Sequence, residues 1–175
     1  MEIVINDTNI FLDLYDIGLL DTFFRLPIRV HTVDFVVNEI SRPNQAQAIQ
    51  QLIDNGMLVV KDYSATNIAD LFQFNVECGG NLTLTDSTVI YYAQSLRDCR
   101  ILTGDRQLRN RAEQRGIKVS GILYVFDQLV ELGLLPHAEA SKKLAALFRI
   151  NSRLPKGEVE ARIEKWKEYK TIETK

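Results

Sequence analysis

The feature that most constrains the fold is the opening stretch EIVINDTNIFLDL, residues 2–14. Residues 3–5, Ile-Val-Ile, form a β-branched run typical of a strand buried on both faces of a parallel sheet. Asp7 follows where that strand should end, and apolar residues then recur at helical spacing. Because ligands bind at the carboxyl ends of strands in open α/β sheets, Asp7 is the first candidate functional residue. The structural alternative is that Asp7 caps a helix opening at Asn9.

The rest of the chain alternates strand and helix patterns. Further strands are expected at residues 28–31, 57–60, 100–103 and 117–119. Helices are expected at residues 9–25 as one helix or a broken pair, and then at 34–40, 46–53, 82–96, 105–115, 121–132, 138–149 and 157–170. Strands separated by helices predict a three-layer α/β/α sandwich with a mostly parallel sheet. The last two helical patterns have no strand beside them, so we predict a domain at residues 1–135 and a C-terminal helical extension at 136–175.

One more helix is expected to begin at Ser64 and to be broken by Gly79 and Gly80. Its apolar positions recur at helical spacing, which predicts that they form its buried face. These positions are Ala65, Ile68, Ala69, Phe72 and Val76.

Composition restricts the class of protein. Hydrophobic residues make up 46% of the 175 residues, which is enough for a real core. Two cysteines are too few for a disulfide framework, and with two histidines they match no zinc-ligand spacing. There is no signal-peptide pattern and no apolar run approaching 18 residues. We therefore expect a soluble, cytoplasmic protein without a membrane segment.

Charge is unevenly distributed along the chain. Residues 1–96 hold 4 Lys or Arg against 12 Asp or Glu, whereas residues 97–175 hold 17 against 11. This asymmetry is compatible with a basic flank that attracts a polyanion to an acidic pocket, and also with solvated helix faces. Charges of alternating sign in residues 158–173 favour the second interpretation for that segment.

Four acids occupy positions that can converge. Asp105 repeats the placement of Asp7, since it follows an apolar run and leads into a helix. Asp86 begins the helix before that strand, and Glu39 lies on the short helix after the second strand. Each has a structural alternative: Asp105 as a helix N-cap, Asp86 in a capping box with Thr83, and Glu39 as a solvated charge.

Clustered carboxylates repel one another by on the order of 4 kcal/mol per close pair at an effective dielectric near 20. Such a cluster needs cations or protons, and the oxygen ligands favour Mg²⁺ or Mn²⁺. A water activated by such an ion would attack a phosphodiester. The residues therefore predict metal-dependent phosphodiester hydrolysis, with Asp7, Glu39, Asp86 and Asp105 as catalytic residues and metal ligands.

Four motifs in order, DTNIFLDL, VVNEI, LTLTDSTVIYYA and ILTGDRQLRNRAEQRGIKVSG, resemble the PIN domain family of metal-dependent ribonucleases over residues 2–121. The resemblance implies a PIN-like sandwich, an RNA substrate and the same four acids as the acidic set. It also implies that Thr8, Asn9 and Thr103 orient the carboxylates.

Similar proteins include toxins of toxin-antitoxin pairs and homodimers, so an antitoxin partner and a homodimer are further expectations. The helical tail departs from the minimal toxin pattern. Arg106 and Arg109 are candidates for RNA contact. The alternative function is a non-catalytic module that binds RNA or a protein on a PIN-like scaffold.

Overall fold

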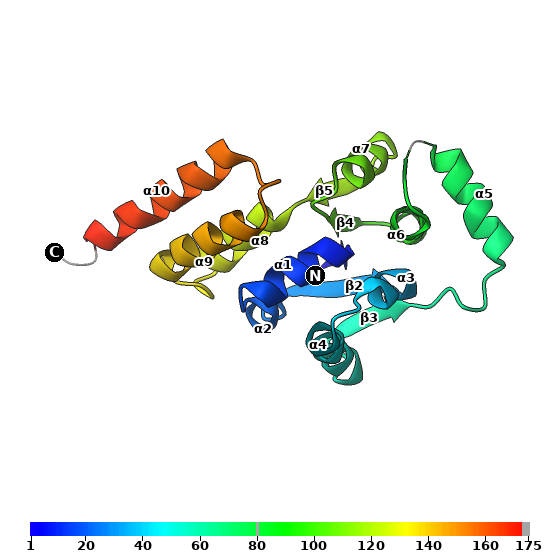
Figure 1. Cartoon of the computed structure of the whole chain (residues 1–175), viewed down its shortest axis with the longest axis horizontal. Helices are drawn as coiled ribbons and strands as arrows, with labels where there is room; N and C mark the ends of the chain where they lie inside the picture. The colour runs from blue at the N-terminus through cyan, green and yellow to red at the C-terminus, as the bar shows by residue number, and fades with distance from the viewer. Residues whose placement is uncertain (80, 173–175) are drawn as a thin grey trace. The chain divides into compact units, whose positions relative to one another are not determined.

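The computed structural model describes residues 1–79 and 81–172. A five-stranded sheet runs through the described residues in the order β3-β2-β1-β4-β5, and all neighbouring strands are parallel (Figure 1). The strands are β1 (Glu2–Asn6), β2 (Ile28–Val33), β3 (Leu58–Lys61), β4 (Cys99–Leu102) and β5 (Lys118–Ser120). The predicted α/β/α sandwich with a parallel sheet is therefore confirmed.

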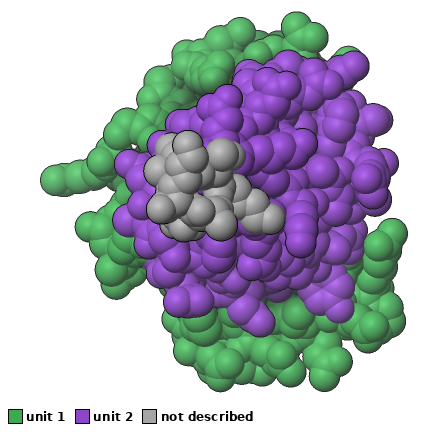
Figure 2. Space-filling model, turned by 90° about the vertical axis from the view of Figure 1, so that its left-hand side faces the viewer, with its two compact units in different colours: residues 1–12, 27–121 green, residues 13–26, 122–175 purple. Residues whose placement is uncertain are grey.

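The chain divides into two compact units, coloured separately in Figure 2: unit 1 holds residues 1–12 and 27–121, and unit 2 holds residues 13–26 and 122–175. Unit 1 contains the whole sheet and the helices α3 (Asp34–Glu39), α4 (Pro43–Asp54), α5 (Ile68–Cys78), α6 (Leu84–Ser95) and α7 (Arg106–Gln114). Unit 2 contains α2 (Leu20–Phe23), α8 (Ile122–Glu131), α9 (His137–Ile150) and α10 (Lys156–Ile172). Helix α1 (Thr8–Asp16) begins in unit 1 and ends in unit 2.

The opening strand forms as its composition predicts. Val4 and Ile5 are fully buried in β1, the central strand of the sheet. Ile5 lies beside His31 of β2 and Ile101 of β4 in the strand register, so these three side chains share one face of the sheet. Helix α6 covers that face, because the hydroxyl of its Tyr92 lies 2.7 Å from Nδ1 of His31. Packing on both sides of β1 holds the residue after it in a fixed place.

Helix α5 differs from the sequence prediction. It begins at Ile68 rather than Ser64, because the side chain of Asn67 accepts a hydrogen bond from the N–H of Ala69 and caps the helix. The predicted buried positions Ile68, Phe72 and Val76 are 50%, 53% and 72% exposed. The residues that are buried in α5 are instead Leu71 and Cys78.

The reason for this error is that α5 is apolar around most of its circumference and packs mainly against one helix, α6, with Arg115 at the end of α7 lying over its Phe74. Spacing alone does not tell which apolar stripe faces that helix. Gly79 ends α5 in the left-handed conformation, with φ at +65°. The predicted break at Gly80 lies outside the described residues.

In unit 2 the two C-terminal helical patterns form α9 and α10, which pack against each other. Leu144 and Leu147 of α9 are fully buried, and so is Val159 of α10. The predicted single helix or broken pair at residues 9–25 is a broken pair, α1 and α2. No helix in the described part of the chain is long and apolar enough to cross a membrane.

Candidate active site

Asp7 stands at the carboxyl end of the central strand. Its N–H donates to the carbonyl of Leu102 at 3.0 Å, which extends the pairing of β1 with β4 by one residue. The side chain is only 4% exposed. Its Oδ1 accepts from the N–H of Thr8 at 2.7 Å, and its Oδ2 accepts from Nδ2 of Asn9 at 2.6 Å and from the hydroxyl of Thr103 at 2.7 Å. Three donors therefore fix the orientation of this carboxylate.

Asp105 follows the adjacent strand, β4, as the sequence predicts. The Thr103 hydroxyl that donates to the first carboxylate also accepts from the N–H of Asp105 at 2.9 Å. Oδ1 of Asp105 accepts from the N–H groups of Gln107 and Leu108 at 2.7 and 2.8 Å, so Asp105 is also the N-cap of α7. One oxygen of Asp105 is used in capping, and its second oxygen accepts no hydrogen bond in the described residues.

The side chain of Asn9 also links the residues that follow β1 and β4. While its Nδ2 donates to Asp7, its Oδ1 accepts from the N–H of Gly104 at 2.8 Å. A Cβ on Gly104 would lie 3.2 Å from that oxygen, which is tighter than an ordinary contact. Position 104 therefore favours glycine, because the close approach of Asn9 leaves little room for a side chain.

Asp86 occupies the third position of α6 and forms the predicted capping box. The Thr83 hydroxyl accepts from the N–H of Asp86 at 3.0 Å, and Oδ2 of Asp86 accepts from the N–H and the hydroxyl of Thr83 at 3.0 and 2.8 Å. Both bonds to the carboxylate end on one oxygen, Oδ2. The structural role and a role at the site are therefore compatible in one side chain.

Glu39 lies at the end of α3, after β2, which is the other neighbour of β1. Its Oε2 accepts a hydrogen bond of 2.6 Å from the Thr8 hydroxyl. Since the N–H of Thr8 donates to Asp7, Thr8 bridges two of the predicted carboxylates. Glu39 is exposed, so it is a solvated carboxylate that also contacts Thr8.

Electrostatics link the four acids. The pKa of Asp7 is raised to about 6, mainly by burial and to a smaller extent by the charges of Asp86 and Glu39, while the hydrogen bonds from Thr103 and Thr8 oppose the rise. Burial also raises the pKa of Asp86, and the charges of Asp105 and Glu39 add to that effect. Unit 1 therefore gathers four mutually repelling carboxylates at one edge of the sheet.

The ligand chemistry of this edge fits a hard divalent ion, since every donor is a carboxylate oxygen and the charges repel one another. Within the described residues, no group of three or more His, Cys, Asp or Glu side chains is already arranged to hold a metal ion. The predicted residues are thus brought to one edge without forming a finished coordination shell.

Sequence reasoning missed Asn6, the last residue of β1. Its side chain is fully buried, and neither its Oδ1 nor its Nδ2 has a hydrogen-bond partner among the described residues. Its backbone carbonyl accepts from the hydroxyl of Thr32 on β2 at 2.8 Å. A polar residue at the end of a buried apolar strand was the available signal, because such groups are ordinarily satisfied.

The candidate RNA-contact residues differ in exposure. Arg106 is exposed at the first turn of α7, directly after Asp105. Arg109 is half-buried, and its Nη1 donates to the carbonyl of Val119 and to Glu113. Arg106 is therefore the cation of this pair that is better placed to meet a phosphate.

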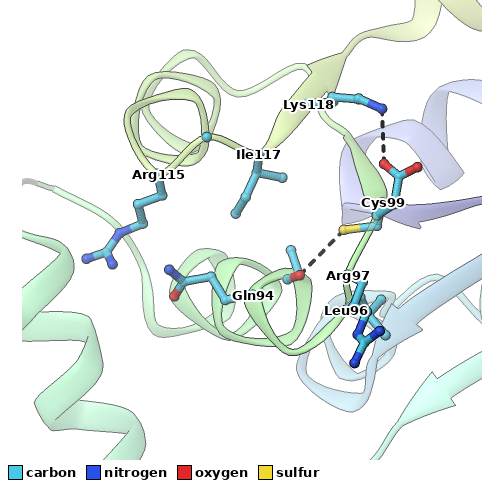
Figure 3. Close-up of a pocket in the computed structure, with 10 residues that line it drawn as sticks. Gln94, Leu96, Arg97, Cys99, Arg115, Ile117 and Lys118 are labelled. Carbon is cyan, nitrogen blue, oxygen red and sulfur yellow. Dashed lines mark hydrogen bonds and ion pairs between the residues drawn. The ribbon is translucent and has the colours of Figure 1, made fainter.

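A hollow of about 320 Å³ in unit 1 is separate from these acids (Figure 3). It lies at the start of β4, opposite to the carboxyl edge, and Figure 3 shows Gln94 and Ile117 among its walls. Cys99 donates through Sγ to the carbonyl of Ala93, and burial raises the pKa of its thiol. This thiol is therefore held as an inert structural group rather than an active nucleophile.

The fold and its acidic edge define a class of protein: a parallel α/β/α sandwich with carboxylates gathered at the ends of its strands. A family model for DUF3368, described as a PIN domain, matches residues 3–168. The chain therefore belongs to the PIN domain family. PIN domains generally have a nuclease-type fold. The match extends beyond residue 121, where the motif resemblance ends, into α10. Comparison with curated proteins finds no match.

Proposed function

We propose that the protein is a divalent-metal-dependent endoribonuclease that hydrolyses RNA phosphodiester bonds at the carboxyl edge of the sheet. The observation that carries this proposal is the buried carboxylate of Asp7, whose pKa is raised to about 6 by burial and by the charges of Asp86 and Glu39. Repulsion between carboxylates is relieved by a cation, so the edge is suited to bind one.

Asp7, Glu39, Asp86 and Asp105 are the residues that would hold Mg²⁺ or Mn²⁺. Such an ion stabilises charge on a phosphate and lowers the pKa of water, which is the chemistry that phosphodiester hydrolysis needs. Glu39 has a second possible role as the base that accepts the proton of the attacking water, because its carboxylate is held beside Asp7 by Thr8.

The surrounding side chains position these carboxylates. The hydroxyl of Thr103 and the amide of Asn9 hold Oδ2 of Asp7, and the N–H of Thr8 holds Oδ1. Fixed orientation matters because a displacement of about 1 Å in a reacting group lowers the rate by about 100-fold. Arg106, exposed beside the edge, would contact a phosphate of the RNA.

The direct test is cleavage of a labelled RNA by the purified chain in Mg²⁺, in Mn²⁺ and in chelator, for the wild type and Asp7→Asn. We expect metal-dependent cleavage that Asp7→Asn lowers by at least about 100-fold. Asp98→Asn is a matched control, since Asp98 is an exposed carboxylate before β4, paired with Lys118. Equal cleavage by the wild type and Asp7→Asn, or none by the wild type, refutes the proposal.

A second candidate function is a non-catalytic module that binds RNA or a protein. The observation that favours it is that no three carboxylates in the described residues are already arranged around a metal position. A thermal shift with Mn²⁺ separates the two functions. Stabilisation of the wild type that disappears in Asp86→Asn supports the nuclease, whereas no stabilisation of either supports the binding module.

We further propose an antitoxin partner, a homodimeric state and a cytoplasmic location, all of which rest on resemblance to PIN domain toxins. Two free, buried cysteines are compatible with a reducing compartment. Co-expression with the product of the adjacent gene tests the first: a stable complex with loss of cleavage supports an antitoxin, and absence of a complex refutes it. Sedimentation of the chain alone tests the second, with a mass near 20.0 kDa excluding the dimer.

A further inference from the structure

A cavity outside the acidic edge lies in unit 2. It has a volume of about 610 Å³ and is lined by side chains of α8, the first residue of α9, and α10. Ligand pockets ordinarily measure about 300–1,000 Å³. The cavity is therefore large enough for a small molecule or for one nucleotide.

Aromatic rings form one part of the wall. Trp166 is 3% exposed and stacks on Phe126, with ring centres 6.1 Å apart and planes at 28°. His137 and Tyr169 stack more closely, at 4.4 Å and 15°, and Tyr169 remains 47% exposed. A rigid aromatic ring that is half exposed beside a cavity is a suitable surface for another planar ring.

Charged groups of both signs form the rim. Arg162 donates from Nε and Nη2 to the two carboxylate oxygens of Asp127, at 2.9 and 2.7 Å, so both groups are paired. Lys165 is exposed and forms no ion pair within the described residues. Glu131 is an exposed carboxylate that accepts from Gln128 at 3.3 Å. The cavity therefore offers a cation and a carboxylate beside an aromatic surface.

We propose that this cavity binds one ribonucleotide. Its base would stack on Tyr169, base N–H groups would donate to Glu131, and the phosphate would meet Lys165. A purely apolar ligand would make no use of the exposed Lys165, and a simple anion would meet the exposed carboxylate of Glu131 beside it. A nucleotide suits all three groups: its base would stack on Tyr169, the N–H groups of the base would donate to Glu131, and its phosphate would contact Lys165.

The nucleotide has two possible sources, a free mononucleotide or a nucleotide within single-stranded RNA. Only the second rests on the proposed function, since the nucleotide would then be part of the RNA substrate. The two are distinguished by comparing adenosine and guanosine monophosphates with an oligoribonucleotide of about ten nucleotides. Tighter binding of the oligonucleotide identifies RNA as the source, and equal or tighter binding of a mononucleotide identifies the free nucleotide.

The chain supplies its own reporter. Trp166 is its single tryptophan and lines the cavity, so its fluorescence should respond when a base enters. The titration uses the full chain in chelator, where metal-dependent cleavage does not proceed. We expect a saturable change with the nucleotides. Ribose 5-phosphate, which has no base, should produce none.

Three variants test the assigned contacts. Tyr169→Ala should weaken binding by about tenfold and Tyr169→Phe should preserve it, because the aromatic face is what the base needs. Lys165→Gln should weaken binding by about fivefold, because it removes the phosphate contact. Lys167→Gln is the matched control, as it removes an exposed lysine of the same helix that does not line the cavity.

Circular dichroism establishes that each variant retains its helices. Asp7→Asn should bind the mononucleotides as the wild type does while losing cleavage of RNA, so the two proposals fail separately. Absence of a fluorescence response to every nucleotide overturns the inference. So does an equal response to ribose 5-phosphate, unchanged affinity in both Tyr169→Ala and Lys165→Gln, or loss of binding in Asp7→Asn.

Discussion

The raised pKa of Asp7 predicts that the apo protein becomes less stable as the pH rises through about 6. Burial is the main cause of the rise from the ordinary value of 3.8. Because the folded pKa lies above the unfolded pKa, the stabilising contribution is fully present below pH 3.8 and is lost as the pH rises through about 6. The difference between these pKa values corresponds to about 3 kcal/mol of unfolding free energy.

Asp7→Asn removes the titrating group and so isolates its contribution. The variant loses part of the hydrogen bonding from Asn9 and Thr103, but that loss does not depend on pH in this range. The difference in melting temperature, variant minus wild type, should therefore increase between about pH 4 and pH 7 and then level off. For a chain of this length, about 3 kcal/mol corresponds to an increase of about 6–12 °C.

The assay is differential scanning fluorimetry of both proteins in chelator at half-unit pH steps. Asp98→Asn provides the control, since its carboxylate is exposed and its difference from the wild type should stay nearly constant over the same range. If the difference in melting temperature between Asp7→Asn and the wild type is constant from pH 4 to pH 8, the pKa of Asp7 is not raised in the folded protein. The electrostatic reasoning would then be refuted.

Three further predictions follow from the packing and the hydrogen bonds. Thr103→Val should lower stability by about 1–3 kcal/mol in urea unfolding and reduce RNA cleavage, because the buried hydroxyl joins two carboxylate-bearing segments, whereas Thr103→Ser should retain both. Leu71→Ala should lower the free energy of unfolding by about 2–4 kcal/mol, whereas Phe72→Ala should change it by no more than about 0.5 kcal/mol. A larger loss of stability in Phe72→Ala than in Leu71→Ala would instead support the buried face expected from sequence. Arg106→Ala should weaken RNA binding, measured by filter binding in chelator, and should reduce the number of ions released on binding by about one. Arg111→Ala is the control, because the Arg111 side chain donates to Gln114. Equal effects of the two substitutions would exclude a specific contact by Arg106.

The sequence was sufficient to predict the positions of the two acids that directly follow buried strands, Asp7 and Asp105. The β-branched run before Asp7 and the apolar pair before Asp105 each predict a strand, and the acid after each strand is then placed at the carboxyl edge. What sequence alone did not provide was the pairing of β1 with β4, because strand order depends on how the crossovers pack and not on local pattern. The structure supplies that neighbour relation, on which convergence of the two acids depends.

The errors have a common physical origin. In α5, Phe72 and Leu71 are both apolar and adjacent, so helical spacing supports two faces and only contact with α6 selects Leu71. Asn6 was missed because its burial is set by the strands on either side of β1 rather than by its own residue type. Local patterns give the type of element reliably, while the rotation of a helix and the burial of a polar side chain depend on partners far along the chain.

The hydrogen bond from Thr103 to Asp7 joins residues separated by 96 positions. A ribosome synthesising this chain therefore releases the first acid long before the strand that orients it. Until β4 has emerged and paired with β1, Asp7 lacks the hydrogen bond from Thr103 to its Oδ2, so the acidic edge is assembled only after synthesis has passed residue 105. A fragment that stops short of β4 lacks Thr103 and Asp105, and so lacks part of the acidic edge.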